Sequence, residues 1–131
     1  SLFPVTQKRY LIGQSLAGLL ATEILLTQPM LFTHYIIISP SLWWDDGSMI
    51  QRKTTALAHQ KLSVYLAVGR EGLSPGKNPH VMETDAHLLE EKLKDGLSAE
   101  SRLFLDYLPR ENHATITHQA VYNAFRWMKN Q

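Results

Sequence analysis

Short apolar runs alternate with longer helical patterns along this chain, and that alternation restricts the fold more than any other feature of the sequence. The apolar runs lie at residues 9–12, 35–39, 64–68 and 103–108, and each precedes a turn-like loop. Strands separated by helices are typical of βαβ units, in which neighbouring strands run parallel. We therefore expect an α/β fold with a mostly parallel sheet of about four strands, all of them internal to the sheet.

Three segments between and after these runs are predicted to be helices. Residues 16–28 are apolar nearly all round and stop before Pro29, as expected of a helix buried against a sheet. An amphipathic pattern begins at Met82 and ends near Gly96. A third helix closes the chain, with a predicted inner face of Val121, Ala124, Phe125 and Met128. The chain has 131 residues, which is enough for one domain spanning residues 1–131.

Composition excludes several classes of function. The chain is 44% hydrophobic and 19% charged with a formal net charge of +1, so nucleic acid is not an expected partner. No apolar run reaches the roughly 18 residues that a membrane span requires, and residues 1–10 contain no apolar core like that of a signal peptide. Cysteine is absent, so we expect no disulfide and no thiolate chemistry, which suits a cytoplasmic or a periplasmic location equally.

A glycine-rich hexapeptide joins the first predicted strand to the first predicted helix. Residues 13–18 read GQSLAG, and a serine on a tight strand-to-helix turn is the pattern of a nucleophile elbow. Residues two positions to either side of such a serine nearly touch, and Gly13 and Ala17 are both small. The turn would expose the Ser15 hydroxyl and direct the Leu16 N–H towards a developing oxyanion.

An acid and a histidine follow at later strand ends. The run 64–68 leads to Glu71, and the run 103–108 leads to His113, just before the last helix. Enzymes with a serine on such an elbow arrange their triad in the order serine, acid, histidine. An imidazole ordinarily titrates near pH 6.5, which suits it to take and return the serine proton. We predict Ser15 as nucleophile, His113 as general base and Glu71 as the acid.

Four other carboxylates compete with Glu71 for the acid position. Asp106 lies inside a predicted strand, and Glu111 is very close to His113 in sequence. Asp45 and Asp46 follow the preceding strand, where some hydrolases do carry their acid. The sequence favours Glu71 over these four.

Three segments in order resemble one known family. Residues 13–19 (GQSLAGL), 39–44 (SPSLWW) and 111–114 (ENHA) are similar to motifs of the Putative esterase family of α/β-hydrolases. The SPSLWW segment most resembles the branch that contains ferric-enterobactin and bacillibactin esterases. The resemblance covers nearly the whole chain and implies the C-terminal half of an α/β-hydrolase fold acting on a small-molecule ester. Ala17 departs from the family, which usually has glycine there. Some siderophore esterases of this branch use a dyad of serine and histidine, so the resemblance leaves open a site without an acid.

The remaining candidate residues are two tryptophans and several charged side chains. Trp43 and Trp44 are predicted to bind substrate by walling an acyl or catechol pocket, because indoles offer flat apolar surface. Loop cations that could meet an anionic substrate are Arg70, Lys77 and Arg110. A possible ligand set on one helix face consists of His80, Glu83 and His87, but its spacing is not that of a zinc site. We expect no metal and no cofactor.

An α/β-hydrolase sheet usually has about eight strands and takes a second oxyanion N–H from a loop upstream of the elbow. This chain begins one strand before Ser15, so we expect it to be the C-terminal part of a longer protein. The strand at residues 9–12 would then lack one neighbour, and copies of the chain could associate into a homo-oligomer through that edge.

The leading functional hypothesis is a serine carboxylic-ester hydrolase that forms an acyl-Ser15 intermediate, with siderophore-type trilactones as the first candidate substrates. Two alternatives stay open. One is a non-catalytic binding or assembly module with a degenerate hydrolase fold, and the other is an acyltransferase that uses the same residues.

Overall fold

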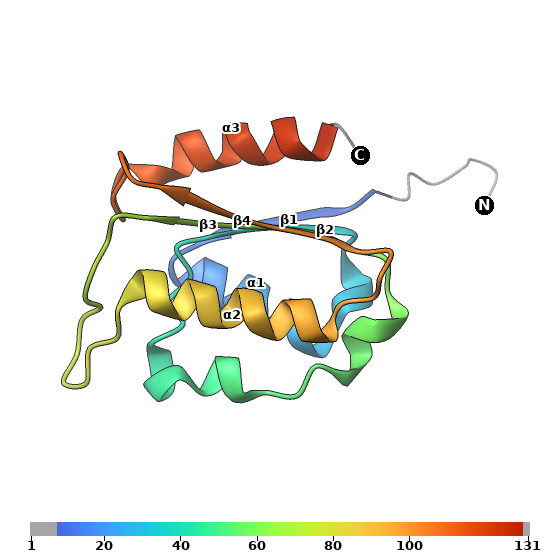
Figure 1. The fold of residues 1–131 in the computed structure, drawn as a ribbon, viewed down its shortest axis with the longest axis horizontal. Coiled ribbons are helices and arrows are strands. Elements are labelled where there is room, and N and C mark those ends of the chain that lie inside the picture. The colour runs from blue at the N-terminus through green and yellow to red at the C-terminus, as the bar shows by residue number, and fades with distance from the viewer. Residues whose placement is uncertain (1–7, 130–131) are drawn as a thin grey trace.

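The protein is a four-stranded parallel sheet covered by helices on both faces (Figure 1). The computed structural model describes residues 8–129, without the side chain of Thr55, so the expected domain of residues 1–131 and the expectation for residues 1–10 extend beyond the described part. The strands are β1 (Tyr10–Gln14), β2 (His34–Ile38), β3 (Ser63–Gly69) and β4 (Arg102–Leu108). The helices are α1 (Leu16–Thr27), α2 (Met82–Gly96) and α3 (Ile116–Lys129), with short 3₁₀ segments η1 (Pro29–Leu31), η2 (Trp44–Gln51) and η3 (Thr55–His59).

Helices α1 and α2 lie on one face of the sheet and α3 lies on the other (Figure 1). The central strand β2 supplies Tyr35 and Ile37 to the core under α1 and α2, and Ile36 and Ile38 to the core under α3. All four of these side chains are fully buried. A strand covered on both faces must be apolar at every position, which explains the continuous apolar run in this part of the sequence.

The expectation that all four strands are internal is wrong for β1 and β4. The strand order is β1-β2-β3-β4, so among the described strands β1 and β4 form the two edges. Ile12 of β1 and Phe104 of β4 are 44% and 40% exposed. An apolar run reports the hydrophobicity of a strand and contains no information on how many neighbours the strand has, so an edge strand can resemble an internal one.

Two expectations about helix faces are also wrong. Helix α1 buries only part of its surface, because Leu16 and Leu20 are 56% and 57% exposed. Phe125, expected on the inner face of α3, is 43% exposed, and its ring contacts the ring of Tyr10 at a centroid distance of 5.7 Å. As expected, Val121, Ala124 and Met128 pack into the core between α3 and the sheet. Phe125 instead packs beside the edge strand β1.

Parallel pairing brings the carboxyl ends of the strands to one side of the molecule. Gln14 is in register with Ile38, and Gly69 is in register with Leu108. The segments that follow the strands therefore gather at one end of the sheet, where open α/β sheets bind ligands. These segments contain Ser15, Glu71 and His113. No helix among residues 8–129 is long and apolar enough to cross a membrane.

Candidate active site

Ser15 occupies a strained turn between β1 and α1. Its backbone adopts φ 59° and ψ −119°, an uncommon conformation for a residue with a side chain. The turn is held by the Ser15 N–H, which donates to the Ile38 carbonyl at 3.0 Å, and by the Ser15 carbonyl, which accepts from Ser41 N–H at 3.1 Å. A Cβ at Gly13 would lie 2.2 Å from the carbonyl oxygen of Ala17. Only glycine therefore fits at position 13.

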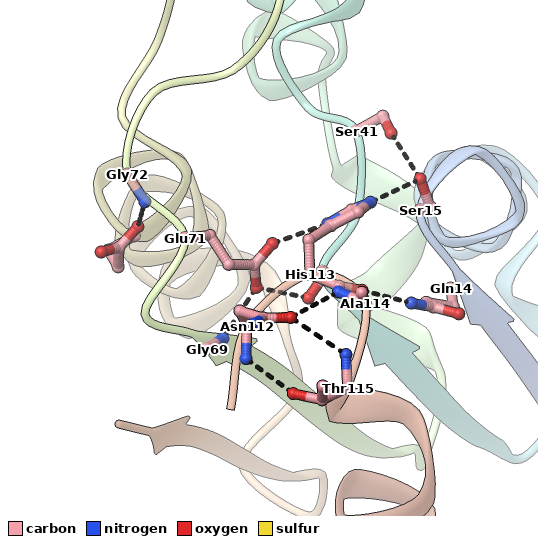
Figure 2. A network of polar contacts seen from close by, with 12 residues as sticks. Gln14, Ser15, Ser41, Gly69, Glu71, Gly72, Asn112, His113, Ala114 and Thr115 are labelled. Atoms are coloured by element: carbon pink, nitrogen blue, oxygen red, sulfur yellow. Dashed lines mark hydrogen bonds and ion pairs between the residues drawn. The ribbon is translucent and has the colours of Figure 1, made fainter. Parts of the chain in front are cut away.

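A continuous line of hydrogen bonds joins Ser15, His113 and Glu71 (Figure 2). The distance from Ser15 Oγ to His113 Nε2 is 3.0 Å, and the distance from His113 Nδ1 to Glu71 Oε1 is 2.7 Å. The carboxylate favours the tautomer with the proton on Nδ1, which leaves Nε2 free to accept from the serine hydroxyl. The fold thus brings together three residues that are up to 98 positions apart in the sequence.

Glu71 is buried and fully hydrogen-bonded on its second oxygen. Its side chain is 2% exposed, whereas that of His113 is 47% exposed. Glu71 Oε2 accepts from the backbone N–H of Gly69 at 2.8 Å and from Ser39 Oγ at 2.5 Å. These two donors and His113 hold the carboxylate in one orientation. Figure 2 shows Gly69 and His113 on either side of Glu71. Sequence reasoning assigned no role to Ser39, although this residue begins the SPSLWW segment.

Hydrogen bonds of two side chains, Asn112 and Gln14, hold the loop that presents His113. Asn112 Oδ1 accepts from the N–H groups of Ala114 and Thr115 at 2.8 and 3.1 Å, at the start of α3. The side-chain amide of Gln14 donates to the carbonyl of His113 at 3.0 Å. Figure 2 shows Gln14 and Asn112 beside the loop that presents His113. Both residues lie within motifs found in the sequence, but those motifs do not indicate that Gln14 and Asn112 hold this loop.

A pocket of about 390 Å³ opens beside the serine. Its lining consists of Ser15, Leu16, Ser41, Trp43, Trp44, Glu71, Leu73, Ser74, Pro75, Met82 and His113. The two indoles meet at a centroid distance of 5.9 Å, Trp43 half-buried and Trp44 54% exposed. Ser41 Oγ, also in the lining, lies 3.4 Å from Ser15 Oγ. Apart from Glu71 and His113, the large side chains around the pocket are apolar, so it is suited to a hydrophobic or aromatic group.

Two of the competing carboxylates, Asp106 and Asp46, bond to partners other than His113. Asp106 accepts from the Tyr65 hydroxyl at 2.5 Å and from Asn123 at 3.1 Å. Burial and this carboxylate raise the pKa of Tyr65 above its usual value. Asp46 bonds to His80 at 3.2 Å, and Asp45 lies beside it in a left-handed turn. The Glu111 carbonyl accepts from Arg70 N–H at 2.8 Å, so this residue contributes its backbone to the loop.

Leu16 is the first residue of α1, so its N–H is one of those at the helix N-terminus that have no acceptor within the helix.

The three loop cations Arg70, Lys77 and Arg110 are exposed, and the pocket lining does not include them. Among residues 8–129, no three His, Asp or Glu side chains are placed to hold a metal ion. Within the trio considered for metal, His80 bonds to two aspartates and Glu83 accepts from Gly72 N–H at 2.9 Å.

The parallel sheet, the strained serine turn and the adjoining histidine and acid define an α/β-hydrolase-type protein. A sequence profile of the Putative esterase family matches residues 1–104, and the chain belongs to that family. The matched region includes Ser15 and Glu71 and stops before His113.

The relatives are siderophore esterases and similar hydrolases. The chain is 38% identical over 53 residues to a siderophore triacetylfusarinine C esterase of Aspergillus fumigatus, a match that covers 40% of this chain and 18% of that protein. It is 33% identical over 73 residues to the ferri-bacillibactin esterase BesA of Bacillus subtilis, covering 51% of this chain and 25% of the relative. An IroE-like serine hydrolase from Shewanella oneidensis superposes with a TM-score of 0.75 at 25% identity, over 95% of this chain and 41% of that one. The matches thus span less than half the length of these proteins.

Proposed function

We propose that the protein is a serine esterase that hydrolyses carboxylic esters through an acyl-Ser15 intermediate. The observation that supports this most directly is the hydrogen-bonded line from Ser15 Oγ through His113 to the buried carboxylate of Glu71. A serine hydroxyl is a weak nucleophile by itself and becomes reactive when a positioned base removes its proton.

The reaction proceeds in two halves. His113 Nε2 takes the proton of Ser15 Oγ as the oxygen attacks the ester carbonyl, and the resulting imidazolium is stabilised by Glu71. His113 then returns the proton to the leaving alcohol, which leaves the acyl group on Ser15. In the second half, His113 takes a proton from water, the hydroxide attacks the acyl carbon, and Ser15 regains its proton as the acid departs.

The tetrahedral oxyanion needs hydrogen-bond donors already in place. The Leu16 N–H lies at the N-terminus of α1, where the helix dipole also favours negative charge. In related hydrolases a second donor comes from a loop upstream of the elbow. We propose that the Leu16 N–H is one of the oxyanion donors in this protein.

Siderophore-type trilactone esters are the proposed substrates. The named relatives include a triacetylfusarinine C esterase and a ferri-bacillibactin esterase. In this chain the apolar pocket beside Ser15, with Trp43 and Trp44 in its wall, is suited to receive an aromatic or other bulky acyl group.

Labelling with a fluorophosphonate tests the esterase proposal, because this reagent reacts only with an activated serine. We expect stoichiometric labelling of the natural full-length protein, lost in Ser15→Ala and His113→Ala. Absence of labelling in the wild-type protein would refute the esterase and favour a binding module. If the protein cleaves simple aryl esters but leaves ferric and iron-free trilactones uncleaved, the proposed substrate class is refuted. The proposal that the protein is a serine esterase would still stand.

A further inference from the structure

Two long loops form the apolar side of the pocket, and they come from different parts of the chain. The segment after β2 supplies Trp43 and Trp44, and the segment between β3 and α2 supplies Leu73, Ser74 and Pro75. The first segment continues into the 3₁₀ segment η2, and the second has no helix or strand of its own, so side-chain contacts help to fix the distance between the two loops. His80 makes such contacts with both.

The backbone of His80 fixes the loop that contains Leu73 and Pro75. The His80 N–H donates to Ser74 Oγ at 2.9 Å, and the His80 carbonyl accepts from Ser74 N–H at 2.7 Å. Ser74 lies between the two pocket-lining residues and is itself 6% exposed. This pair of bonds closes the loop into a hairpin, which continues in the bridge between Leu73 and Val81.

The imidazole of His80 extends from that hairpin to the tryptophan segment. Its Nδ1 lies 2.9 Å from Oδ2 of Asp85, a buried residue in the first turn of α2. Its Nε2 lies 3.2 Å from Oδ1 of Asp46, two residues after Trp44. The ring also packs on Gly47, where an added Cβ would lie 3.1 Å from Cε1.

The turn that His80 holds is strained. Asp45, Asp46 and Gly47 all have positive φ, at 52°, 50° and 75°. For residues with a side chain, the left-handed region is unfavourable, so such a turn persists only where its surroundings hold it. The bond to His80 provides that support, directly after the two indoles.

The charged groups that act on the imidazole are Asp46 from η2 and Asp85 from α2. Hydrogen bonds to Asp46 and then to Asp85 raise the pKa of His80 above its usual value, against a smaller opposing effect of burial. Below the raised pKa both ring nitrogens donate, one to each carboxylate. Above it the neutral ring has one N–H, so one of the two contacts loses its donor. The attachment therefore weakens as the pH rises through the pKa of His80.

We propose that His80 is a positioning residue for the substrate pocket, which fastens the Trp44–Gly47 turn to the 72–81 hairpin and thereby determines selectivity for bulky aromatic acyl groups. The inference rests on the proposed esterase function. The residues that line the pocket do not include His80, and the acyl transfer proposed above does not use it. Its effect reaches the substrate through Trp44 on one loop and through Leu73 and Pro75 on the other.

The test compares p-nitrophenyl benzoate with p-nitrophenyl acetate in the natural full-length protein. The acetyl group is too small to depend on the apolar wall, whereas the benzoyl ring requires it. In His80→Gln we expect KM for the benzoate to rise about tenfold with kcat changed by less than about twofold, because ground-state binding is lost and the chemistry is retained. KM for the acetate and the rate of fluorophosphonate labelling should change by less than about twofold.

Asp46→Asn is the second variant, because the Asp46 side chain is 79% exposed and its replacement leaves the fold intact even if His80→Gln is poorly folded. We expect the same selective rise in KM, with recovery in Asp46→Glu. His87→Gln, on the exposed side of α2, is the matched control and should leave both esters unaffected. In the wild type, KM for the benzoate should rise with pH through the pKa of His80, and this rise should be absent from His80→Gln.

Equal losses for both esters, or a fall in kcat without a change in KM, would show a general structural role and overturn the inference. Unchanged benzoate kinetics in His80→Gln and Asp46→Asn would overturn it as well. A wild-type protein that neither cleaves the esters nor reacts with the fluorophosphonate would instead refute the proposed function, and the inference with it.

Discussion

At the scale of single residues, the geometry separates one carboxylate from its competitors. Glu71 bonds to the imidazole at 2.7 Å and is buried, whereas Asp106 bonds to Tyr65 and Asp46 bonds to His80. A buried carboxylate stabilises the imidazolium formed during attack and keeps the proton on the correct nitrogen. Kinetic measurements on variants of these carboxylates can therefore test which one is the catalytic acid.

Glu71→Gln is predicted to lower kcat for p-nitrophenyl acetate by about 10² to 10⁴-fold, because the amide favours the wrong tautomer and cannot stabilise the imidazolium. Circular dichroism and thermal unfolding should show a folded protein. Asp45→Asn and Glu111→Gln are the matched controls and should be mild. A loss of about tenfold or less would remove Glu71 from the mechanism and leave a dyad of Ser15 and His113.

Ser39→Ala tests how the acid is held. The variant removes a donor at 2.5 Å from a buried carboxylate, leaving Glu71 Oε2 with the Gly69 N–H. Hydrogen bonds to charged groups contribute about 1.5–3 kcal/mol, so the free energy of unfolding should fall by about that amount in urea denaturation. The value of kcat should also fall, with little change in KM. Unchanged stability and kcat would show that Ser39 does not restrain Glu71.

At the scale of secondary-structure elements, the junction between β1 and α1 determines whether the serine is reactive. The turn needs the close approach of residues 13 and 17, and the parallel register then places the loops after β3 and β4 beside it. A change that widens this turn should move Ser15 Oγ away from His113 without touching either residue.

Gly13→Ala is predicted to abolish fluorophosphonate labelling and to destabilise the protein by about 1–3 kcal/mol, as expected when a group is inserted where there is no space. The added Cβ would meet the Ala17 carbonyl oxygen at 2.2 Å, which is backbone and cannot rotate away. Ala17→Gly, on the opposite side of the same contact, is the control and should retain labelling. A labelled, stable Gly13→Ala protein would contradict this account of the turn.

At the scale of the whole molecule, exposed apolar side chains occur on the edge strand β1 and on the helix α1 that follows it. Ile12, Leu16 and Leu20 are all more than 40% exposed, and β1 pairs with a strand on one side only among the described residues. Unpaired strand edges with apolar side chains tend to pair with other chains. This edge is where further strands, or a second copy, would extend the sheet.

A polypeptide of residues 1–131 is predicted to self-associate, with an apparent mass by light scattering that increases with concentration. Ile12→Lys should shift the population towards monomer, because a charged side chain on an edge strand opposes pairing. Tyr107→Lys places the same charge on the opposite edge, at a residue that is 47% exposed, and serves as the control. Equal effects of both substitutions, or a monomer at every concentration, would contradict association through β1.

The order of elements and the serine turn were determined by the sequence alone. Both depend on local information: side-chain periodicity separates strands from helices, and the small residues around Ser15 allow a tight turn. The positions of Glu71 and His113 after successive strands followed from the same reasoning, since parallel strands end on one side of a sheet.

Only the tertiary structure decided which strands form the edges, which faces of α1 and α3 stay exposed, and how the site is supported. Ser39 reaches Glu71 across 32 positions, Gln14 reaches the His113 loop across 99, and His80 reaches Asp46 across 34. Such contacts depend on how loops from different strands meet in space, and side-chain periodicity does not predict the arrangement of these loops. A polar residue that restrains an active site and one that faces solvent look the same in the sequence, because the difference between them is the distance to a partner far along the chain.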